Sequence, residues 1–257
     1  MKRNRAAFTI VQNEPLFLPK WLDYYGGHFP SGDLYVLDHA TTDGSTAAAA
    51  RTWPTVRFVP VHRLESFNHN WLRETVEAFQ RFLLQSYDNV LFAEADEFVV
   101  ADPHRYGGLG RYIERFEMPI VRCQGLNVYQ TPEEAPLDFA RPWLPQRTNA
   151  YEAVLYSKPI LSKLPLRWAM GFHSLEGALP PPLDSDLFLF HCHRIDYDYC
   201  VRRHQSARQR NWSQADLAMG LGIQNRIVEP TEFRTWYYGG ADLGERSFAI
   251  PESLKVF

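Results

Sequence analysis

Three carboxylates end a short apolar run in the first half of the chain. The run over residues 90–93 stops at Glu94, Asp96 and Glu97, and apolar residues resume at Phe98. On an extended segment, residues i and i+2 point to the same side, so Glu94 and Asp96 are predicted to form a pair. Paired carboxylates suit Mg²⁺ or Mn²⁺, which keep positions for water and for phosphates. The alternative for any such acidic group is a turn that faces water.

The elements around these acids alternate between strand and helix. Strands are predicted over residues 6–11, 34–37, 56–61 and 90–93, and helices over 16–25, 68–86 and the Ala-rich part of 41–51. Continuous apolar strands separated by amphipathic helices indicate an α/β fold with a mostly parallel sheet and helices on both faces. Ligands bind outside the carboxyl ends of such strands. The polar residues that follow the strands therefore form the candidate site: Asn13, Glu14, Asp38, His39 and the three acids.

The second half of the chain has a different pattern. Residues 131–148 are Pro-rich and irregular, the segments 120–129, 151–164 and 187–193 are predicted to be extended, and 196–210 is predicted to form a basic helix. Alternation places His191 and His193 on one face of their strand, and a pair at this spacing suits a metal ion. His173 is a third candidate, although single histidines are more often hydrogen-bonded structural residues. The change near residue 130 is interpreted as the second half of one domain and not as a linker.

Composition argues against several classes of protein. The 257 residues are 45% hydrophobic, which is enough for one large core, and the net charge of −3 gives no general attraction to nucleic acid. No apolar run approaches the roughly 20 residues that span a bilayer. The basic N-terminus is followed by too short an apolar stretch for a secretion signal. Three widely spaced cysteines fit reduced thiols in a cytoplasmic protein better than a disulfide framework or a zinc site.

Three segments together resemble the glycosyltransferases of the GT-A fold. "LFAEADEFVV" resembles the segment in which these enzymes carry an Asp-x-Asp motif between apolar runs. "FTIVQNEPLFLPKWLDYY" resembles the family's first strand and helix, and "LYVLDHATTDGST" resembles the segment after its second strand. The three occur in the family's order over residues 5–100, and the closest branch is the family-2-like one with a (D/E)xDEF metal motif. The chain departs from the pattern at Glu94, His39 and Thr41, where the family has Asp, Asn and Ser.

The resemblance implies one GT-A glycosyltransferase domain over residues 1–257. Residues 1–130 would form the nucleotide-binding half, and 131–257 the acceptor-side half with a C-terminal helical elaboration. The implied reaction moves a sugar from a nucleotide-diphosphate sugar to a hydroxyl of a saccharide or lipid-linked acceptor, with Mn²⁺ or Mg²⁺ as cofactor. The expected pathway is surface polysaccharide or lipopolysaccharide assembly, in the cytoplasm or in peripheral contact with the inner face of the membrane.

Two other functions remain as alternatives. A non-catalytic relative that binds nucleotide sugars is the first, because Glu94 departs from the motif. A nucleotidyltransferase is the second. It is disfavoured because the loop after the first strand, residues 12–15, lacks the glycines and cations that hold a triphosphate.

The resemblance also implies roles for single residues. Asp96 is predicted to bind the metal and the diphosphate, and Glu94 to approach the metal or the ribose, with Glu97 supporting the site or structural. Asp38 is predicted to face the nucleotide base, whereas a helix-cap or turn role is the alternative that Asp43 fits even better. The other nucleotide-binding candidates are Val11, Asn13, Glu14 and Asp43; the other metal candidates are His191 and His193; His173 and Lys158 are candidate phosphate or metal contacts.

The sequence does not identify the catalytic base. An inverting transferase needs a base for the acceptor hydroxyl. Glu176 is the candidate, and the alternatives are Glu133, Glu134 and Asp138. Phosphate contacts are predicted among Lys158, Lys163, Arg202, Arg203 and Arg208. A basic helix is more often a solvated face, and contact with a membrane surface is a further use of its charge.

Overall fold

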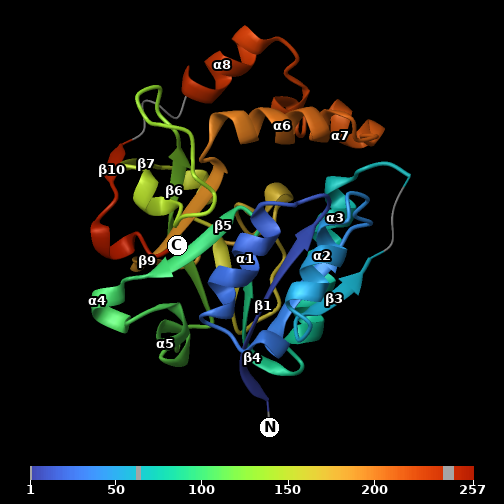
Figure 1. Ribbon diagram of the computed structural model, residues 1–257. Helices are drawn as coiled ribbons and strands as arrows, with labels where there is room; N and C mark the ends of the chain where they lie inside the picture. The colour runs from blue at the N-terminus through green and yellow to red at the C-terminus, as the bar shows by residue number, and fades with distance from the viewer. Residues whose placement is uncertain (1, 62–64, 240–245) are drawn as a thin grey trace.

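Four parallel strands from the first half of the chain form the core of the sheet. The computed structural model describes residues 2–61, 65–239 and 246–257. It orders these strands β3–β2–β1–β4 (Figure 1). Their bounds are β1 Arg3–Val11, β2 Leu34–Asp38, β3 Arg57–Pro60 and β4 Tyr87–Phe92. Because the four strands run in the same direction, their carboxyl ends meet at one edge of the sheet, and the loops with the predicted site residues leave from that edge.

The second half of the chain extends the sheet with strands of mixed direction. β8 pairs antiparallel with β4, and β6, β7 and β10 continue the order outward. β9 pairs parallel with β6 and antiparallel with β5. The bounds are β5 Glu97–Ala101, β6 Ile120–Tyr129, β7 Asn149–Glu152, β8 Pro159–Ser162, β9 Leu183–Arg194 and β10 Ser247–Ala249. The predicted α/β class is confirmed, and its parallel part is the half in which strands and helices alternate along the sequence.

A turn breaks the segment that is predicted to be extended over residues 151–164. β7 and β8 are separated by the 3-10 turn Val154–Tyr156. This turn packs directly on Gly125 of β6, where an added Cβ would lie 2.2 Å from the carbonyl carbon of Tyr156. Only a glycine leaves room for such a close approach of two backbones. The prediction of one long extended segment is wrong here, and the turn brings Tyr156 to the cavity described below.

Helices cover both faces of the parallel strands, as predicted. On the face of α1 and α2, Ala7 and Leu91 join the buried cluster that contains Trp21. On the face of α3, Phe8 packs in the cluster that contains Val76. Successive strand residues point to opposite faces, so Ala7 and Phe8 serve different layers. The helix bounds are α1 Phe17–Gly26, α2 Ser45–Thr52, α3 His69–Leu83, α4 Pro103–Tyr106, α5 Leu109–Glu114, α6 Tyr197–Arg208, α7 Gln214–Ala218 and α8 Pro230–Gly239.

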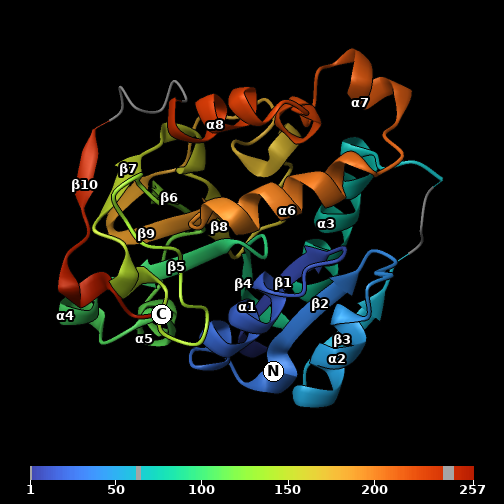
Figure 2. The ribbon, with the colours of Figure 1, turned by 45° about the horizontal axis from the view of Figure 1, so that its top comes forward.

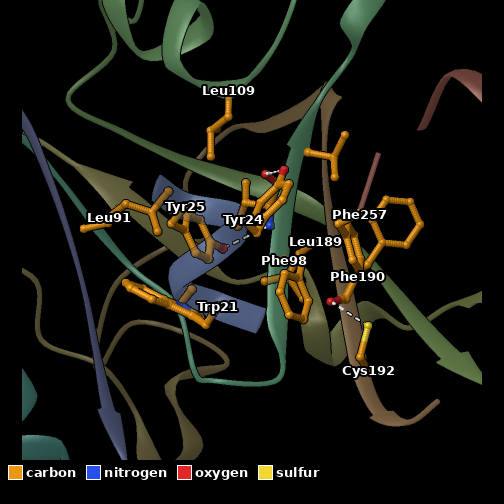
Figure 3. Packing of buried hydrophobic residues seen from close by; sticks show 14 of the residues in the cluster. Trp21, Tyr24, Tyr25, Leu91, Phe98, Leu109, Leu189, Phe190, Cys192 and Phe257 are labelled. Atoms are coloured by element: carbon orange, nitrogen blue, oxygen red, sulfur yellow. Dashed lines mark hydrogen bonds between the residues drawn. The ribbon is translucent and has the colours of Figure 1, made fainter. Parts of the chain in front are cut away.

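Two tyrosines of α1 fix the strand that follows the acidic residues. Figure 3 shows Tyr24 and Tyr25 packed beside Phe98 of β5. The Tyr24 hydroxyl donates to the Val99 carbonyl at 2.7 Å. The Tyr25 hydroxyl accepts from the Val99 N–H at 3.1 Å and donates to the Glu97 carbonyl at 3.0 Å. Because buried hydroxyls need such partners, these bonds fix the position of β5 relative to α1 and also the position of the turn before it.

Helix α6 crosses the carboxyl edge of the parallel strands (Figure 1, Figure 2). It begins after Asp196, whose carboxylate accepts from the Tyr199 N–H at 2.8 Å and caps the helix. Beyond it, the buried Asp216 of α7 accepts from the backbone N–H of His69 at 3.1 Å and lies 3.0 Å from the His69 ring nitrogen. Helix α7, which follows α6, is thereby tied to the start of α3. In the described ranges, none of the helices is long and apolar enough to cross a membrane.

Candidate functional site

A cavity of about 710 Å³ opens at the carboxyl edge of the parallel strands. The loops after β1, β2 and β4 line it from one side, and β9, α6 and the segments that flank α7 line it from the other. Polar and charged groups in its lining include Glu14, His39, Glu94, Asp96, His173, His191, His193, Arg194, Arg203 and Arg210. A smaller hollow of about 310 Å³ shares Gln12, His39, Phe67 and Arg210 with it. The cavity lies where the sheet topology predicts a ligand site.

The acidic residues after β4 lie in a turn and not on an extended segment. The turn is closed by a hydrogen bond from the Glu97 N–H to the Glu94 carbonyl at 3.0 Å. Glu94 and Asp96 therefore do not point together, and that prediction is wrong. The Glu94 and Glu97 carboxylates each lie 2.6 Å from the Lys158 ammonium, whereas Asp96 faces β9 and α6. Glu94, Lys158 and Glu97 are called the Lys158 cluster below.

The cation of the Lys158 cluster is closed off from solvent. The side chains of Lys158 and Glu97 are each 1% exposed, and that of Glu94 is 39% exposed. Burial by itself would lower the pKa of Lys158, but Glu94 and Glu97 outweigh burial and raise it. Burial raises the pKa of Glu97 to about 7, although Lys158 opposes the rise. Lys158 is therefore a neutralised structural cation, and the geometry does not place it as the predicted phosphate or metal contact.

Asp96 meets a second cation, Arg203 of α6. The Asp96 carboxylate oxygen Oδ2 lies 2.5 Å from Arg203 Nη1, and Arg203 Nη2 lies 2.7 Å from Glu14 Oε1. Burial would raise the pKa of Asp96, but Arg203 and the neighbouring histidines outweigh it and hold the pKa well below the usual range. Asp96, Arg203 and Glu14 are called the Arg203 cluster below. It lines the cavity, unlike the Lys158 ammonium.

Two histidines of β9 direct lone pairs at Asp96. His191 Nδ1 lies 2.8 Å from Asn127 Oδ1, which accepts, so Nδ1 donates and the lone pair lies on Nε2. His204 Nδ1 lies 3.1 Å from the Gln224 carbonyl, which can only accept, so His204 Nε2 is an acceptor. His193 Nε2, at 2.8 Å from it, therefore donates, and the lone pair of His193 lies on Nδ1.

Burial keeps these imidazoles neutral. It lowers the pKa of His193, lowers that of His191 well below its usual value, and lowers that of His204 to about 3. The nitrogens His191 Nε2 and His193 Nδ1 lie 3.9 and 3.2 Å from Asp96 Oδ2. The predicted placement of both histidines on one strand face is confirmed, because their rings stack with centroids 5.8 Å apart.

This donor set fits a divalent metal ion. Asp96, His191 and His193 each offer a ligand atom, and the three atoms lie within 4.8 Å of one another. Two ligands at a right angle on an ion with bonds of about 2.1 Å lie about 3.0 Å apart, close to the 3.2 Å between Asp96 and His193. A carboxylate with two imidazoles suits Mn²⁺ better than Mg²⁺, which favours oxygen ligands. Glu94, predicted as a metal ligand, is not part of this set.

Arginines from α6 and its neighbours give the cavity positive charge. The predicted phosphate contact Arg203 lies in the lining, but Arg202 and Arg208 are exposed and lie outside it. Arg194 and Arg210, which the sequence analysis did not single out, do line the cavity. A signal for Arg210 was present in the helical spacing. Cys200, Arg203 with His204, Ala207 and Arg210 recur every three or four residues, and they form the inward side of α6 and its extension.

The residues predicted to bind the nucleotide divide into two groups. Val11 and Glu14 line the large cavity, and Asn13, with a backbone φ of +57°, lines the smaller hollow. Asp38 instead accepts hydrogen bonds from the Thr41 N–H of its own loop and from the Thr46 hydroxyl of α2, each at 2.9 Å. Asp43 accepts from the backbone and hydroxyl of Ser45 at the start of α2. Neither of these two aspartates lines the large cavity or the smaller hollow, so their geometry is that of the turn and cap alternative.

His39 takes the place at the cavity that was predicted for Asp38. Its ring lies 4.7 Å from that of Trp71 and 6.1 Å from that of Phe67. His39 is among the polar residues predicted at the strand ends, but the nucleotide-facing role was predicted for Asp38. The alternation of side chains along a strand and its exit gives the physical reason, because neighbouring residues face opposite ways.

The candidate bases lie away from the cavity. Glu176 pairs with Arg73 at 3.5 Å and with Arg167 at 3.2 Å, and it is not part of the lining. The alternatives Glu133, Glu134 and Asp138 also lie outside the lining. The geometry therefore places none of the predicted bases at the site. His173 does line the cavity, with its Nδ1 at 2.8 Å from the Leu155 carbonyl.

No protein-family model and no curated protein matches the chain. Solved glycosyltransferases show a distant likeness. S. aureus TarS is 11% identical with a TM-score of 0.42, over 89% of this chain and 44% of its own. The mannosyltransferase PcManGT from Pyrobaculum calidifontis, in complex with GDP-Man and Mn²⁺, is 16% identical with a TM-score of 0.43, over 81% and 63%. The glucosyl-3-phosphoglycerate synthase from Mycobacterium tuberculosis, in complex with Mn²⁺ and UDP, is 17% identical with a TM-score of 0.32, over 48% and 44%. This chain thus spans less than half of the TarS structure.

Proposed function

We propose that the chain is a metal-dependent glycosyltransferase of the GT-A fold. A nucleoside diphosphate sugar would bind in the large cavity, and Asp96, His191 and His193 would hold Mn²⁺. The observation that carries the proposal is the convergence of one carboxylate and two imidazole lone pairs at the carboxyl edge of parallel strands. Bound there, a divalent ion supplies positive charge that stabilises the departing nucleoside diphosphate. The resemblance of the three segments within residues 5–100 supports the same reading.

The side chains of the cavity would orient the donor. Arg194 and Arg210 bring guanidinium groups into the lining, and such groups bind phosphate oxygens with two parallel hydrogen bonds. His39 and Phe67 border both the cavity and the smaller hollow, so they offer ring faces to the nucleobase. Val11 and Glu14 stay in the proposal as residues that shape the nucleotide site.

Two carboxylates replace Glu176 as candidates for the base. Glu94 and Glu232 line the cavity and make no ion pair with Arg203 in the described part of the chain. A base must lie within reach of the acceptor hydroxyl, so position in the cavity is the first requirement. Substitution of the true base by glutamine lowers transfer to the acceptor but leaves Mn²⁺-dependent donor binding intact. Equal transfer rates in Glu94→Gln, Glu232→Gln and the wild type would remove both candidates.

The acceptor and the pathway rest on the resemblance alone. We propose a hydroxyl of a saccharide or a lipid-linked intermediate in surface polysaccharide or lipopolysaccharide assembly. The whole chain would act as one domain on the cytoplasmic side of the membrane, with peripheral contact to its surface.

A thermal-shift screen of nucleoside diphosphates tests the proposal. UDP, GDP, dTDP and CMP compounds are added with and without Mn²⁺, and a ligand that binds the folded state raises the melting temperature. We expect one base to stand out, and only when Mn²⁺ is present. The absence of any shift across the series contradicts the proposed donor site.

Hydrolysis of the donor in the absence of an acceptor separates the enzyme from a binding relative. The enzyme releases nucleoside diphosphate slowly from the nucleotide sugar whose base stands out in the screen. A chain that binds this compound but releases nothing, with metal present, is a binding module.

A further inference from the structure

Arg203 bridges two of the three candidate metal ligands, Asp96 and His193. Its Nη1 lies 2.5 Å from Asp96 Oδ2 and 2.6 Å from His193 Nδ1, so one nitrogen donates to both atoms. Its other nitrogens hold Glu14 Oε1, with Nη2 at 2.7 Å and Nε at 3.1 Å. The guanidinium carbon lies 5.0 Å from the Phe17 ring centroid, which stabilises the cation from a further side. Arg203 is thus the donor to the two facing atoms, Asp96 Oδ2 and His193 Nδ1.

The same two atoms cannot bind a guanidinium and a metal ion at once. The lone pair of His193 Nδ1 is directed at Asp96 Oδ2 across only 3.2 Å, and two acceptors at this distance repel unless a cation lies between them. In the structure, Arg203 provides that cation. A metal ion bound to Asp96 and His193 would provide it instead, with the guanidinium displaced.

We propose that Arg203 is a competing cation built into the metal site. Metal binding requires Arg203 to leave Asp96 and His193. The displaced guanidinium then loses the negative charge of Asp96 as its partner. A diphosphate in the cavity replaces that partner, because it offers charged oxygens to arginine. Metal and donor then strengthen each other's binding, as two ligands that favour the same state must. This inference rests on the proposed function, since it assigns Arg203 a role in the same site.

The burial of the two acids explains why a competing cation is present. Glu14 and Asp96 have side chains only 8% and 7% exposed. Buried carboxylates without a partner are costly, so a metal-free chain without Arg203 would hold two uncompensated charges. Arg203 allows the site to form before the metal arrives, and the affinity for the metal alone is reduced in return.

The test is the affinity for Mn²⁺ alone, measured by isothermal titration calorimetry on the full chain without nucleotide. Arg203→Gln removes the competing charge, and we expect it to bind Mn²⁺ more tightly than the wild type, on the order of tenfold. Arg203→Lys keeps a charge that cannot bridge Glu14 and Asp96 in the same way, so its affinity should lie between the two. If Arg203→Gln does not fold, the comparison of Arg203→Lys with the wild type decides the question.

Two controls separate competition from general repulsion. Arg202→Gln removes the neighbouring charge on the exposed side of α6, and its affinity for Mn²⁺ should equal that of the wild type. Arg210→Gln removes a charge from the same cavity without releasing a ligand atom, so its affinity should rise by less than about threefold. A rise in Arg210→Gln equal to that in the Arg203 variants overturns the inference, because long-range charge would then explain both.

The remaining outcomes are also decisive. Mn²⁺ affinity in the Arg203 variants that is unchanged, weaker or undetectable overturns the competing-cation role. The proposed function is judged separately by nucleotide binding to the wild type with Mn²⁺ present. If nucleotides bind and the Arg203 variants gain nothing, only the inference fails. If the variants gain affinity for Mn²⁺ and no nucleotide binds, the inference stands and the donor site fails.

Discussion

The Lys158 cluster and the Arg203 cluster have the same composition of charges, but their cations differ in access to the cavity. Each places one cation between two carboxylates, and each draws on the four-residue segment from Glu94 to Glu97. Lys158 is 1% exposed and lies outside the cavity lining, whereas Arg203 is 20% exposed and lies within it. Both clusters contain one cation and two carboxylates, so the number of charges does not distinguish them. What differs is that the Arg203 cation reaches the cavity and lies beside imidazole lone pairs, whereas the Lys158 cation does neither.

The largest effect on stability is expected from a substitution in the Lys158 cluster. Lys158→Met leaves Glu94 and Glu97 without their cation and should lower the free energy of unfolding by roughly 3 kcal/mol, the low end for a broken buried pair, because Glu97 can take up a proton. Urea unfolding measures this. Lys163→Met is the control. Lys163 lies at the other end of β8 and makes no ion pair in the described ranges, so its loss should cost under about 1 kcal/mol. A loss of the same size in both variants would mean that the Lys158 cluster is not structural.

Substitutions in the Arg203 cluster should change metal and nucleotide binding more than they change the free energy of unfolding. Asp96→Asn keeps the shape of the side chain but weakens the ligand, so Mn²⁺-dependent nucleoside diphosphate affinity should fall on the order of 100-fold. Calorimetry with the nucleotide found in the screen measures it. Asp43→Asn, which lies outside both cavities, should bind as the wild type does. Equal affinity in Asp96→Asn and the wild type would remove Asp96 from the metal site.

Glu94 decides whether the two clusters are separate. Its carboxylate is half-exposed and its cation is Lys158, so Glu94→Gln should cost under about 1 kcal/mol of stability. Its Mn²⁺ affinity should change by less than about threefold, because Glu94 is not among the three converging ligands. If it were a metal ligand, as the resemblance implies, the affinity would fall as in Asp96→Asn, and the division into two clusters would be wrong.

The smallest effect is expected outside both clusters, at His28. Burial lowers the pKa of His28, and the charge of Arg5 lowers it further. Below about pH 6.5 the unfolded state therefore binds more protons than the folded state, so stability falls as the pH drops toward the folded pKa. His28→Gln should reduce that loss by under about 1 kcal/mol. Urea unfolding at pH 7 and pH 5.5 gives the difference, and an identical loss in variant and wild type would show that His28 does not contribute.

The sequence predicts the parallel half of the fold well, because its elements are decided locally. Continuous apolar runs give β1, β2 and β4, and the apolar stripe of α3 gives the helix that covers them. The break between β7 and β8 is a tertiary effect. It depends on Gly125, about 30 residues earlier in the chain, and a local pattern does not report contacts at that distance.

The site is predictable in part for the same reason. The place of Asp96 follows from the end of a strand, and the shared face of His191 and His193 follows from alternation, both of which are local. Arg203 reaches Glu14 across 189 positions of sequence, and only the crossing of α6 over the strand ends brings them together. The prediction of a basic helix over residues 196–210 is confirmed by α6. The alternative that its basic side chains face water is wrong for Arg203. The inward spacing of Cys200, Arg203 and Ala207 marks the difference.

The hydrogen bond from His204 to the Gln224 carbonyl has a consequence for how this site tolerates substitution. A main-chain oxygen has no proton to give, so it dictates the direction in which every proton points along the series from His204 to His193. Replacement of the Gln224 side chain leaves that oxygen in place, and the orientation of the imidazoles survives. The hydrogen-bonding polarity of His193 Nδ1 is thus set by the course of the backbone between α7 and α8, and the side chain at position 224 does not determine it.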